Sequence, residues 1–205
     1  MRYGMLLDLN TCSGCSACAM ACKIENGTLH GSYWCKVLVK EEGKYPDTKK
    51  KVLPVSCMHC EEAPCVKACP TGASFYDENG PVQIDYTKCI GCRSCISACP
   101  YGVRNYNAEG PAKNPYFADY EMTYFEKAKA AKHPVGKVGK CVLCKDRVEE
   151  GKDPACVMTC LNKCRYFGDL DDPTSEISQK IIELNAKPLF GHHGTKPSFY
   201  YAGTF

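Results

Sequence analysis

The most informative segment of this chain is Cys89-Ile90-Gly91-Cys92-Arg93-Ser94-Cys95-Ile96-Ser97-Ala98-Cys99-Pro100. It carries four cysteines at the spacing C-x2-C-x2-C-x3-C, followed directly by a proline. Three further groups of four cysteines flank it along the chain. In chain order, the four groups are Cys12, Cys15, Cys18 and Cys22; Cys57, Cys60, Cys65 and Cys69; Cys89, Cys92, Cys95 and Cys99; and Cys141, Cys144, Cys156 and Cys160. Of the 18 cysteines in 205 residues, Cys35 and Cys164 fall outside these groups.

This cysteine density is typical of disulfide scaffolds or of metal and cluster binders. Repeated gaps of two residues favour the second class, because a cube of iron and sulfide needs several thiolates from one tight loop. Structural zinc is the main alternative, since C-x2-C pairs also build four-thiolate zinc sites. The first and third groups place three cysteines within seven residues, which favours iron–sulfur clusters. The fourth group, with eleven residues between its second and third cysteines, would by itself resemble a zinc site.

The ligand sets follow from how two-cluster ferredoxins bind their clusters. Three closely spaced cysteines bind three irons from one loop, and the last cysteine of the run binds the other cluster. Applied to this chain, the rule predicts four [4Fe-4S] clusters held by sixteen cysteines. The predicted sets are set A (Cys57, Cys60, Cys65, Cys99), set B (Cys89, Cys92, Cys95, Cys69), set C (Cys12, Cys15, Cys18, Cys160) and set D (Cys141, Cys144, Cys156, Cys22).

Short strands are expected beside the cysteine groups. Residues 75–86 hold an Asn79-Gly80 turn signal between two strand patterns, which predicts a hairpin as in bacterial two-cluster ferredoxins. Apolar runs at Tyr3 to Leu9 and Arg165 to Gly168 predict two more strands. We therefore expect an α+β fold of two bacterial-ferredoxin-like modules, one inserted in the other, with short hairpins, short helices and long loops.

The expected boundaries place groups one and four in an outer module and groups two and three in an inner one. The outer module is residues 1–35 and 136–175, the inner module 52–105, with an insertion at 106–135 and a C-terminal docking tail at 176–205. Residues 188–205 show no helical or strand period, so the tail is expected to be ordered by docking. Each module is small, so bound clusters should supply much of the folding free energy.

Other residues have less specific interpretations. Aromatic residues of the insertion form a short helix, a partner-facing loop or a cover over one module: Tyr116, Phe117, Tyr120, Tyr124 and Phe125. Cations near the predicted ligands favour reduced clusters: Lys23, Lys67, Lys88, Arg93, Lys140 and Lys145. Cys35 and Cys164 are expected to be buried, inert thiols. His59 is expected to pack beside its cluster without binding iron, and His192 and His193 to lie in a solvated loop.

Composition excludes several functions. The net charge is +3 and the isoelectric point is near 8.0, far from that of a dedicated nucleic-acid binder. No run of 18 apolar residues predicts a membrane span, and the N-terminus leads into a cysteine loop instead of a signal peptide. Nucleophile motifs, phosphate loops and dinucleotide fingerprints are missing, so the chain is not expected to be an enzyme on its own.

Several motifs resemble the four-cluster electron-transfer subunits of dimethyl sulfoxide reductase-type molybdopterin enzymes, which include polysulfide, thiosulfate, tetrathionate and arsenate reductases. The matching segments are Asp8-Leu9-Asn10-Thr11-Cys12-Ser13-Gly14-Cys15, Cys57-Met58-His59-Cys60-Glu61-Glu62-Ala63-Pro64-Cys65, Cys89-Ile90-Gly91-Cys92-Arg93-Ser94-Cys95, Lys140-Cys141-Val142-Leu143-Cys144-Lys145-Asp146-Arg147 and Gly168-Asp169-Leu170-Asp171-Asp172-Pro173. The resemblance covers nearly the whole chain. Two departures are Leu161 after Cys160, where the family usually has proline, and a long segment before Cys141.

The resemblance implies a subunit that relays electrons between a large molybdopterin (Mo or W) catalytic subunit and a quinone-linked membrane subunit or a soluble carrier. Some relatives lack a cysteine in the third group and hold a [3Fe-4S] centre, but Cys92 and its neighbours are intact here. The expected location is periplasmic or membrane-associated through partner subunits, with the cytoplasm as the alternative. A free soluble polyferredoxin and a zinc-binding interaction module are the competing functions.

Overall fold

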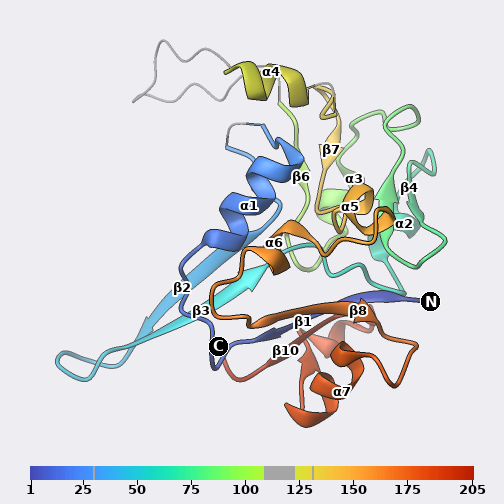
Figure 1. The fold of residues 1–205 in the computed structure, drawn as a ribbon. Helices are drawn as coiled ribbons and strands as arrows, with labels where there is room; N and C mark the ends of the chain where they lie inside the picture. Colours follow the sequence, from blue (N-terminus) through green and yellow to red (C-terminus); the bar gives the residue numbers. More distant parts are fainter. Residues whose placement is uncertain (30, 109–122, 131) are drawn as a thin grey trace.

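The computed structural model describes residues 1–29, 31–108, 123–130 and 132–205 and mixes short strands with short helices (Figure 1). Its largest sheet has four strands in the order β8-β1-β10-β9. The bounds are Tyr3–Asp8 for β1, Arg165–Asp169 for β8, Lys187–Pro188 for β9 and Phe199–Ala202 for β10. β1 pairs antiparallel with β8 and parallel with β10, and β9 pairs antiparallel with β10. The two strands expected beside the outer cysteine groups are confirmed, and they pair with each other.

β1 is buried on both faces because a hydrophobic core lies on each side of the sheet. Met5 and Leu7 face the main core, which also holds cysteine side chains, and Leu6 faces a separate core. That second core is covered by helix α7, Glu176–Glu183, through the fully buried Ile177. The Ser175 hydroxyl caps α7 by accepting from the Ser178 amide at 3.3 Å. The sheet thus separates a cysteine-rich core from a cysteine-free one.

The C-terminal segment has a strand that the sequence pattern did not predict. β10 inserts between β1 and β9, and only the short 3-10 helix η1, Gly191–His193, breaks the preceding loop. Phe199 and Tyr201 are buried in the main core, while Tyr200 and Ala202 lie on the Leu6 side. Because aromatic residues occupy both faces, the strand shows no apolar–polar alternation. This segment docks on the chain's own β1.

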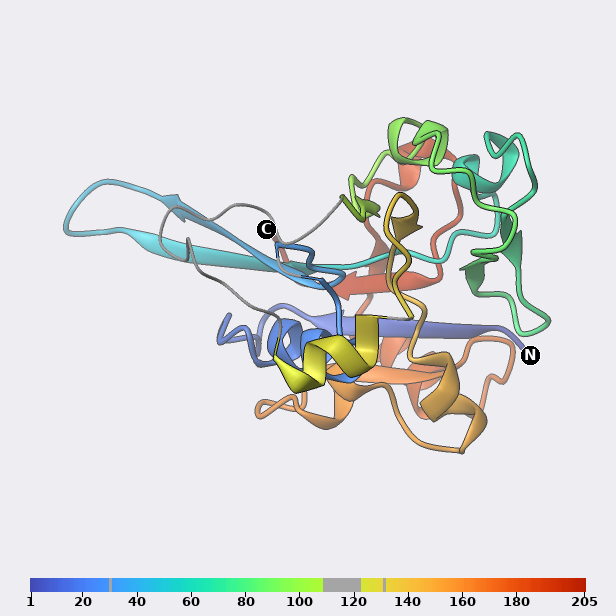
Figure 2. The ribbon, with the colours of Figure 1, turned by 90° about the horizontal axis from the view of Figure 1, so that it is seen from above.

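A second unpredicted feature is the long hairpin of β2, Lys36–Glu42, and β3, Lys49–Val55. Figures 1 and 2 show it projecting from the body of the molecule. Its base is apolar and buried at Leu53 and Val55, whereas its tip carries exposed charges. The sequence pattern was obscured by those charges, some of which pair across the strands, as Lys51 does with Glu42 at 3.0 Å.

Two shorter hairpins lie nearer the cysteine groups. β4, Ser74–Tyr76, pairs with β5, Val82–Ile84, which confirms the hairpin predicted from Asn79-Gly80. Its turn closes through the Asp77 amide, which donates to the Pro81 carbonyl at 2.8 Å. β6, Asn105–Tyr106, pairs with β7, Val138–Gly139, and so joins the two ends of the insertion.

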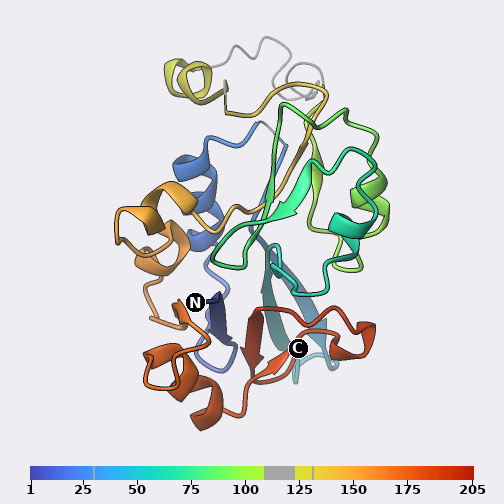
Figure 3. The same ribbon diagram turned by 90° about the vertical axis from the view of Figure 1, so that its right-hand side faces the viewer.

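Four helices carry the third cysteine of each group. They are α1 (Ala17–Asn26, with Cys18), α2 (Pro64–Lys67, with Cys65), α3 (Ser94–Ser97, with Cys95) and α6 (Ala155–Met158, with Cys156). α5, Lys145–Glu149, starts directly after Cys144. α1 contacts α6 and α2 contacts α3. Figure 3 shows α1, α5 and α6 on one side of the molecule and α2 and α3 on the other.

Part of the aromatic insertion forms helix α4, Tyr124–Ala130. Tyr116, Phe117 and Tyr120 lie outside the described residues. Tyr124 is 96% exposed, and Lys129 donates to the Glu25 carbonyl at the end of α1 at 3.1 Å. Within the part of the chain that the structure describes, no helix is long and apolar enough to cross a membrane.

Candidate cluster-binding sites

The first C-x2-C pair of each group shares one backbone feature with those of the other groups. The residue just before the second cysteine has a positive φ in each: 70° at Gly14, 43° at His59, 72° at Gly91 and 56° at Leu143. A left-handed residue curls a short loop and turns successive amide groups to one side, which builds a concave site for an anion. The shared positive φ therefore turns the two thiols of each pair toward the same side of their loop.

Gly91 provides a test of this loop geometry. A Cβ on Gly91 would lie 1.9 Å from the Gly136 carbonyl oxygen, and the left-handed φ adds strain for any other residue. We expect Gly91→Ala to cost about 1–2 kcal/mol for the backbone conformation and about 1–3 kcal/mol more for the overlap. Thermal unfolding of the purified protein measures the loss. Gly72→Ala is the matched control, because Gly72 has a φ of 64° and nothing within 4 Å. Equal destabilisation by both variants would show that the overlap costs nothing.

The structure brings the members of set B together. Cys69, Cys89, Cys92 and Cys95 line one cavity beside Arg104. Cys69 follows α2, and the other three belong to the loop that leads into α3 and to α3 itself. The last cysteine of the second group thus lies with the first three of the third group.

Set C shows the same arrangement in the outer groups. Cys12, Cys15, Cys18 and Cys160 line a second cavity, together with Cys164 and Arg165. The antiparallel pairing of β1 and β8 brings these distant segments together, because group one follows β1 and group four precedes β8.

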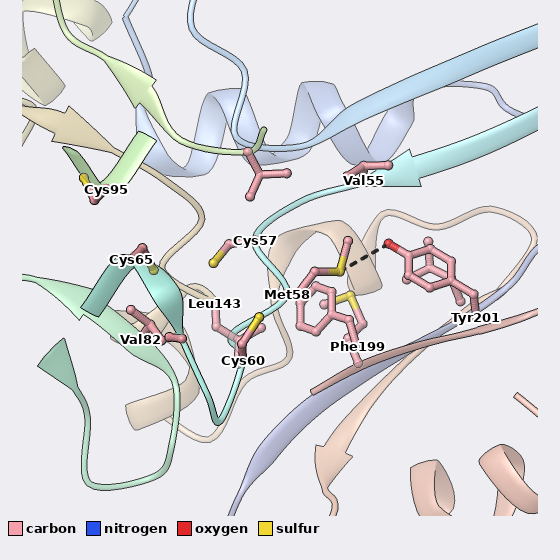
Figure 4. Packing of buried hydrophobic residues seen from close by; sticks show 14 of the residues in the cluster. Val55, Cys57, Met58, Cys60, Cys65, Val82, Cys95, Leu143, Phe199 and Tyr201 are labelled. Carbon is pink, nitrogen blue, oxygen red and sulfur yellow. Dashed lines mark hydrogen bonds between the residues drawn. The ribbon is translucent and has the colours of Figure 1, made fainter. Parts of the chain in front are cut away.

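For sets A and D, the influence of one thiol on the pKa of another indicates which thiols lie close together. Burial raises the pKa of Cys60 to about 12, and the thiols of Cys57, Cys65 and Cys99 contribute to the rise. Figure 4 shows Cys57 and Cys60 among the apolar side chains of Met58, Leu143 and Phe199. Cys60 therefore interacts with the other three members of set A, including the crossing cysteine, Cys99.

In set D, burial raises the pKa of Cys22 to about 12, with contributions from Cys156 and Cys144. Burial likewise raises the pKa of Cys141 well above its usual range, and the next largest contributions come from Cys22 and Cys57. Cys141 thus lies near the crossing cysteine of its own set and near one member of set A.

The sixteen thiols differ in their access to solvent. Cys15 of set C and Cys92 of set B are exposed, whereas every cysteine of sets A and D is buried or half-buried. None of the 18 cysteines forms a disulfide in the structure.

Within the described ranges, three cations are buried among these thiols, and of the three the sequence analysis had named Lys140 alone. Arg104 donates to the Cys65 sulfur at 2.9 Å, and Arg165 donates to the Cys18 sulfur at 3.4 Å. A repeat signal could have found both arginines. Arg104 follows Cys99 by five residues, and Arg165 follows Cys160 by five.

The other cations predicted near ligands contact different groups. Lys67, Lys88 and Lys145 pair with Glu62, Asp85 and Asp77 at 2.7, 3.5 and 2.9 Å. Arg93 lies over the Tyr106 ring at 3.8 Å, and Lys23 donates to the Thr28 and Leu29 carbonyls at 2.9 and 3.0 Å. Proximity in sequence to a cysteine was therefore a poor guide to contact with a thiol.

The two spare cysteines are buried, as expected, and each lies beside a predicted ligand. A hydrogen bond from the Cys35 thiol is the largest cause that lowers the pKa of Cys18 to about 6. The Cys164 sulfur lies 3.4 Å from the Cys160 sulfur. Both spare thiols therefore border set C.

The histidines differ in environment. His59 is buried against Phe199, with ring centroids 5.8 Å apart, and burial lowers its pKa well below the usual range. Neither of its ring nitrogens has a hydrogen-bond partner among the described residues. His192 and His193 are exposed in η1.

This donor set suits an anionic, thiolate-bound inorganic group. It combines paired thiol loops, buried cations beside sulfur, and a buried polar ring at His59 without a partner among the described residues. In the described ranges, no three Cys, His, Asp or Glu side chains converge on a point that could hold a single metal ion. A [4Fe-4S] cluster does not need such convergence, because its thiolates bind different irons.

Comparison with known proteins agrees with this chemistry. Residues 48–114 and 120–170 match the family model of the 4Fe-4S dicluster domain, and residues 9–34 match that of a 4Fe-4S binding domain. The fold and the cysteine sites therefore define a ferredoxin-type [4Fe-4S] protein.

Relatives among characterised proteins are similar over almost the full chain. A selenate reductase subunit of Mesobacillus selenatarsenatis is 41% identical, covering 98% of this chain and 72% of the relative. The arsenate respiratory reductase iron–sulfur subunit ArrB of Shewanella sp. is 37% identical (100% and 97%), and a sulfite dehydrogenase subunit of Allochromatium vinosum is 37% identical (98% and 82%). The chain belongs to the iron–sulfur subunits of dimethyl sulfoxide reductase-type molybdoenzymes.

Proposed function

We propose that sets A to D bind four [4Fe-4S] clusters and that the chain relays electrons through them without catalysing a reaction of its own. A bound [4Fe-4S] cluster supplies reversible one-electron chemistry that no side chain of this protein offers. On this proposal, the protein brings its sixteen thiols together as sets A to D, limits the access of water to sets A and D, and places cations beside sulfur atoms.

The proposal rests on one observation: the four sets form a row, and the exposed thiols belong to the sets at its two ends. Arg104 interacts with members of sets A and B, Cys141 of set D lies near Cys57 of set A, and Arg165 interacts with members of sets C and D. From these interactions we infer that the four sets follow one another in the order B, A, D, C. The exposed thiols, Cys92 and Cys15, belong to the two ends of this row. A row with a buried middle and two ends at the surface suits entry of electrons at one end and exit at the other.

Contacts between helices and strands support an arrangement of two ferredoxin-like modules. The α2–α3 contact and the β4–β5 hairpin belong to the inner module, residues 52–105. The α1–α6 contact and the β1–β8 pairing join the outer segments, residues 1–35 and 136–175. On this division the inner module is inserted in the outer one, and β10 extends the outer sheet.

The partners that we propose are a large molybdopterin catalytic subunit and a quinone-linked membrane subunit or soluble carrier. The names of the relatives, which include subunits of selenate and arsenate reductases, support the first partner. Apolar side chains are exposed beside both ends of the row, with Ile90 at 66% near Cys92 and Leu161 at 81% next to Cys160. We propose a periplasmic or membrane-associated location through these partners.

Anaerobic purification of the native complex tests the proposal. We expect about sixteen irons per chain, from four cubes of four, and a co-eluting large subunit that contains molybdenum or tungsten. Four reduction steps should appear when EPR spectra are recorded during a redox titration. A monomer with full iron content would favour a free polyferredoxin. A colourless protein that contains zinc would refute the cluster assignment.

A further inference from the structure

Among the residues that the structure describes, three cationic side chains are buried: Lys140 fully, and Arg104 and Arg165 with 5% exposure each. None of the ion pairs between described residues includes any of the three. A buried charge without a counter-charge is costly, so an interior cation normally has an anionic partner. The neighbours of these cations are therefore informative.

Arg104 lies between sets A and B. Its guanidinium donates to the Cys65 sulfur at 2.9 Å and to the Ser74 hydroxyl at 3.0 Å, which fixes its orientation. Burial raises the pKa values of Cys65 and Cys95, and in both thiols Arg104 is the largest opposing influence. One side chain thus acts on thiols of two different sets.

Arg165 occupies the corresponding place in the outer groups. It donates to the Cys18 sulfur of set C at 3.4 Å and to the Met5 sulfur at 3.3 Å. Burial raises the pKa of Cys156 of set D, and Arg165 is again the largest opposing influence. Because Arg104 and Arg165 both follow the last cysteine of a group by five residues, their positions are equivalent in the two halves.

Lys140 lies where the two halves meet. Its ammonium group donates to the Val82 carbonyl of β5 and, at 2.8 Å, to the Cys141 carbonyl. Burial lowers its pKa, and the thiols of Cys57 and Cys141 are among the groups that oppose this. Lys140 therefore adjoins set A on one side and set D on the other.

We propose that Arg104, Lys140 and Arg165 are junction charges, each of which raises the midpoint potentials of the two clusters that flank it. This inference rests on the proposed function. A fixed positive charge stabilises the more negative, reduced state of a nearby cluster, and in a buried site this interaction is weakly screened by salt. It also reduces the repulsion between adjacent anionic clusters when an electron resides on either one.

EPR-monitored redox titration of the purified complex tests the inference through the pattern of shifts. We expect Arg104→Gln to lower two of the four midpoint potentials. Lys140→Gln should also lower two, one of which is a potential that Arg104→Gln lowers. Arg165→Gln should lower two, one shared with Lys140→Gln and none shared with Arg104→Gln. This pattern requires no assignment of individual signals to clusters.

Arg93→Gln is the matched control, because it removes the same charge beside Cys92 from an exposed position over Tyr106. It should leave all four midpoints near their original values. Iron analysis confirms that each variant is loaded. Should Arg104→Gln fail to load, Arg104→Lys keeps the charge but loses one of two hydrogen bonds. Because the charge is kept, Arg104→Lys must then shift midpoint potentials by less than Lys140→Gln and Arg165→Gln do.

Unchanged midpoints in loaded variants, or equal shifts of all four, would overturn the inference. The proposed function would still stand if the unmodified complex held about sixteen irons and showed four reduction steps. If the unmodified complex lacked iron, the proposed function would fail before any variant was compared.

Discussion

Removal of the bound iron is expected to abolish the cooperative tertiary structure of this protein. Four of the sixteen buried residues of its main core are cysteines: Cys57, Cys60, Cys65 and Cys95. Burial raises the pKa of Cys60 to about 12 and also raises the pKa values of Cys65 and Cys95, so these three thiols stay neutral at pH 7 when no iron is bound. They would then leave Arg104 and Lys140 buried without an anionic partner, whereas Arg165 would keep Cys18, whose pKa is lowered to about 6.

The magnitudes favour unfolding. An uncompensated buried ion costs several kcal/mol even after relaxation, and the total stability of a domain is about 5–15 kcal/mol. Two such ions are enough to cancel most of it. Near-ultraviolet circular dichroism and limited proteolysis, before and after anaerobic chelation at low pH and return to pH 7, measure the loss.

Reconstitution with iron and sulfide is the control, because it should restore both signals. The cysteine-free core of Leu6, Ile177, Ala186 and Ala202 should lose its structure last. An iron-free chain that retained its near-ultraviolet spectrum and melted cooperatively would show that the clusters are dispensable for folding.

Paired cysteine substitutions should reveal the crossing of ligands between groups. If Cys69 and Cys89 belong to one cluster, Cys69→Ser combined with Cys89→Ser damages a single cluster and leaves three normal reduction steps. Cys69→Ser combined with Cys65→Ser removes neighbours within one cysteine group but damages two clusters. Only two normal steps should then remain in the redox titration.

Cys35→Ser and Cys164→Ser provide the controls, since both thiols border set C without belonging to a predicted set. We expect each to retain four reduction steps. Two remaining steps for the Cys69–Cys89 pair and three for the Cys69–Cys65 pair would mean that each group binds its own cluster, without crossing.

The local structure around the cysteines could largely be predicted from sequence. The hairpin at Asn79-Gly80 and the strands beside the outer groups follow from short-range patterns, and the structure confirms them. The β2–β3 hairpin and β10 could not be predicted in this way. The charged tip of the first and the aromatic residues on both faces of the second obscure the alternation that marks a strand.

The candidate sites divide in the same manner. Cysteine spacing identifies the sixteen thiols, and the comparisons establish the family. Proximity along the chain suggested six cations near ligands, of which Lys140 is the one that lies buried beside the thiols. Arg104 and Arg165 were missed because their thiol partners, Cys65 and Cys18, lie 39 and 147 residues away.

The sequence by itself determined the type of ligand and the number of cysteine groups, because a cluster needs several thiols within one short loop. Tertiary structure alone decided which groups are neighbours, which thiols reach the surface and where the buried cations lie. These properties depend on strand pairing and burial between distant segments, and no local pattern encodes them.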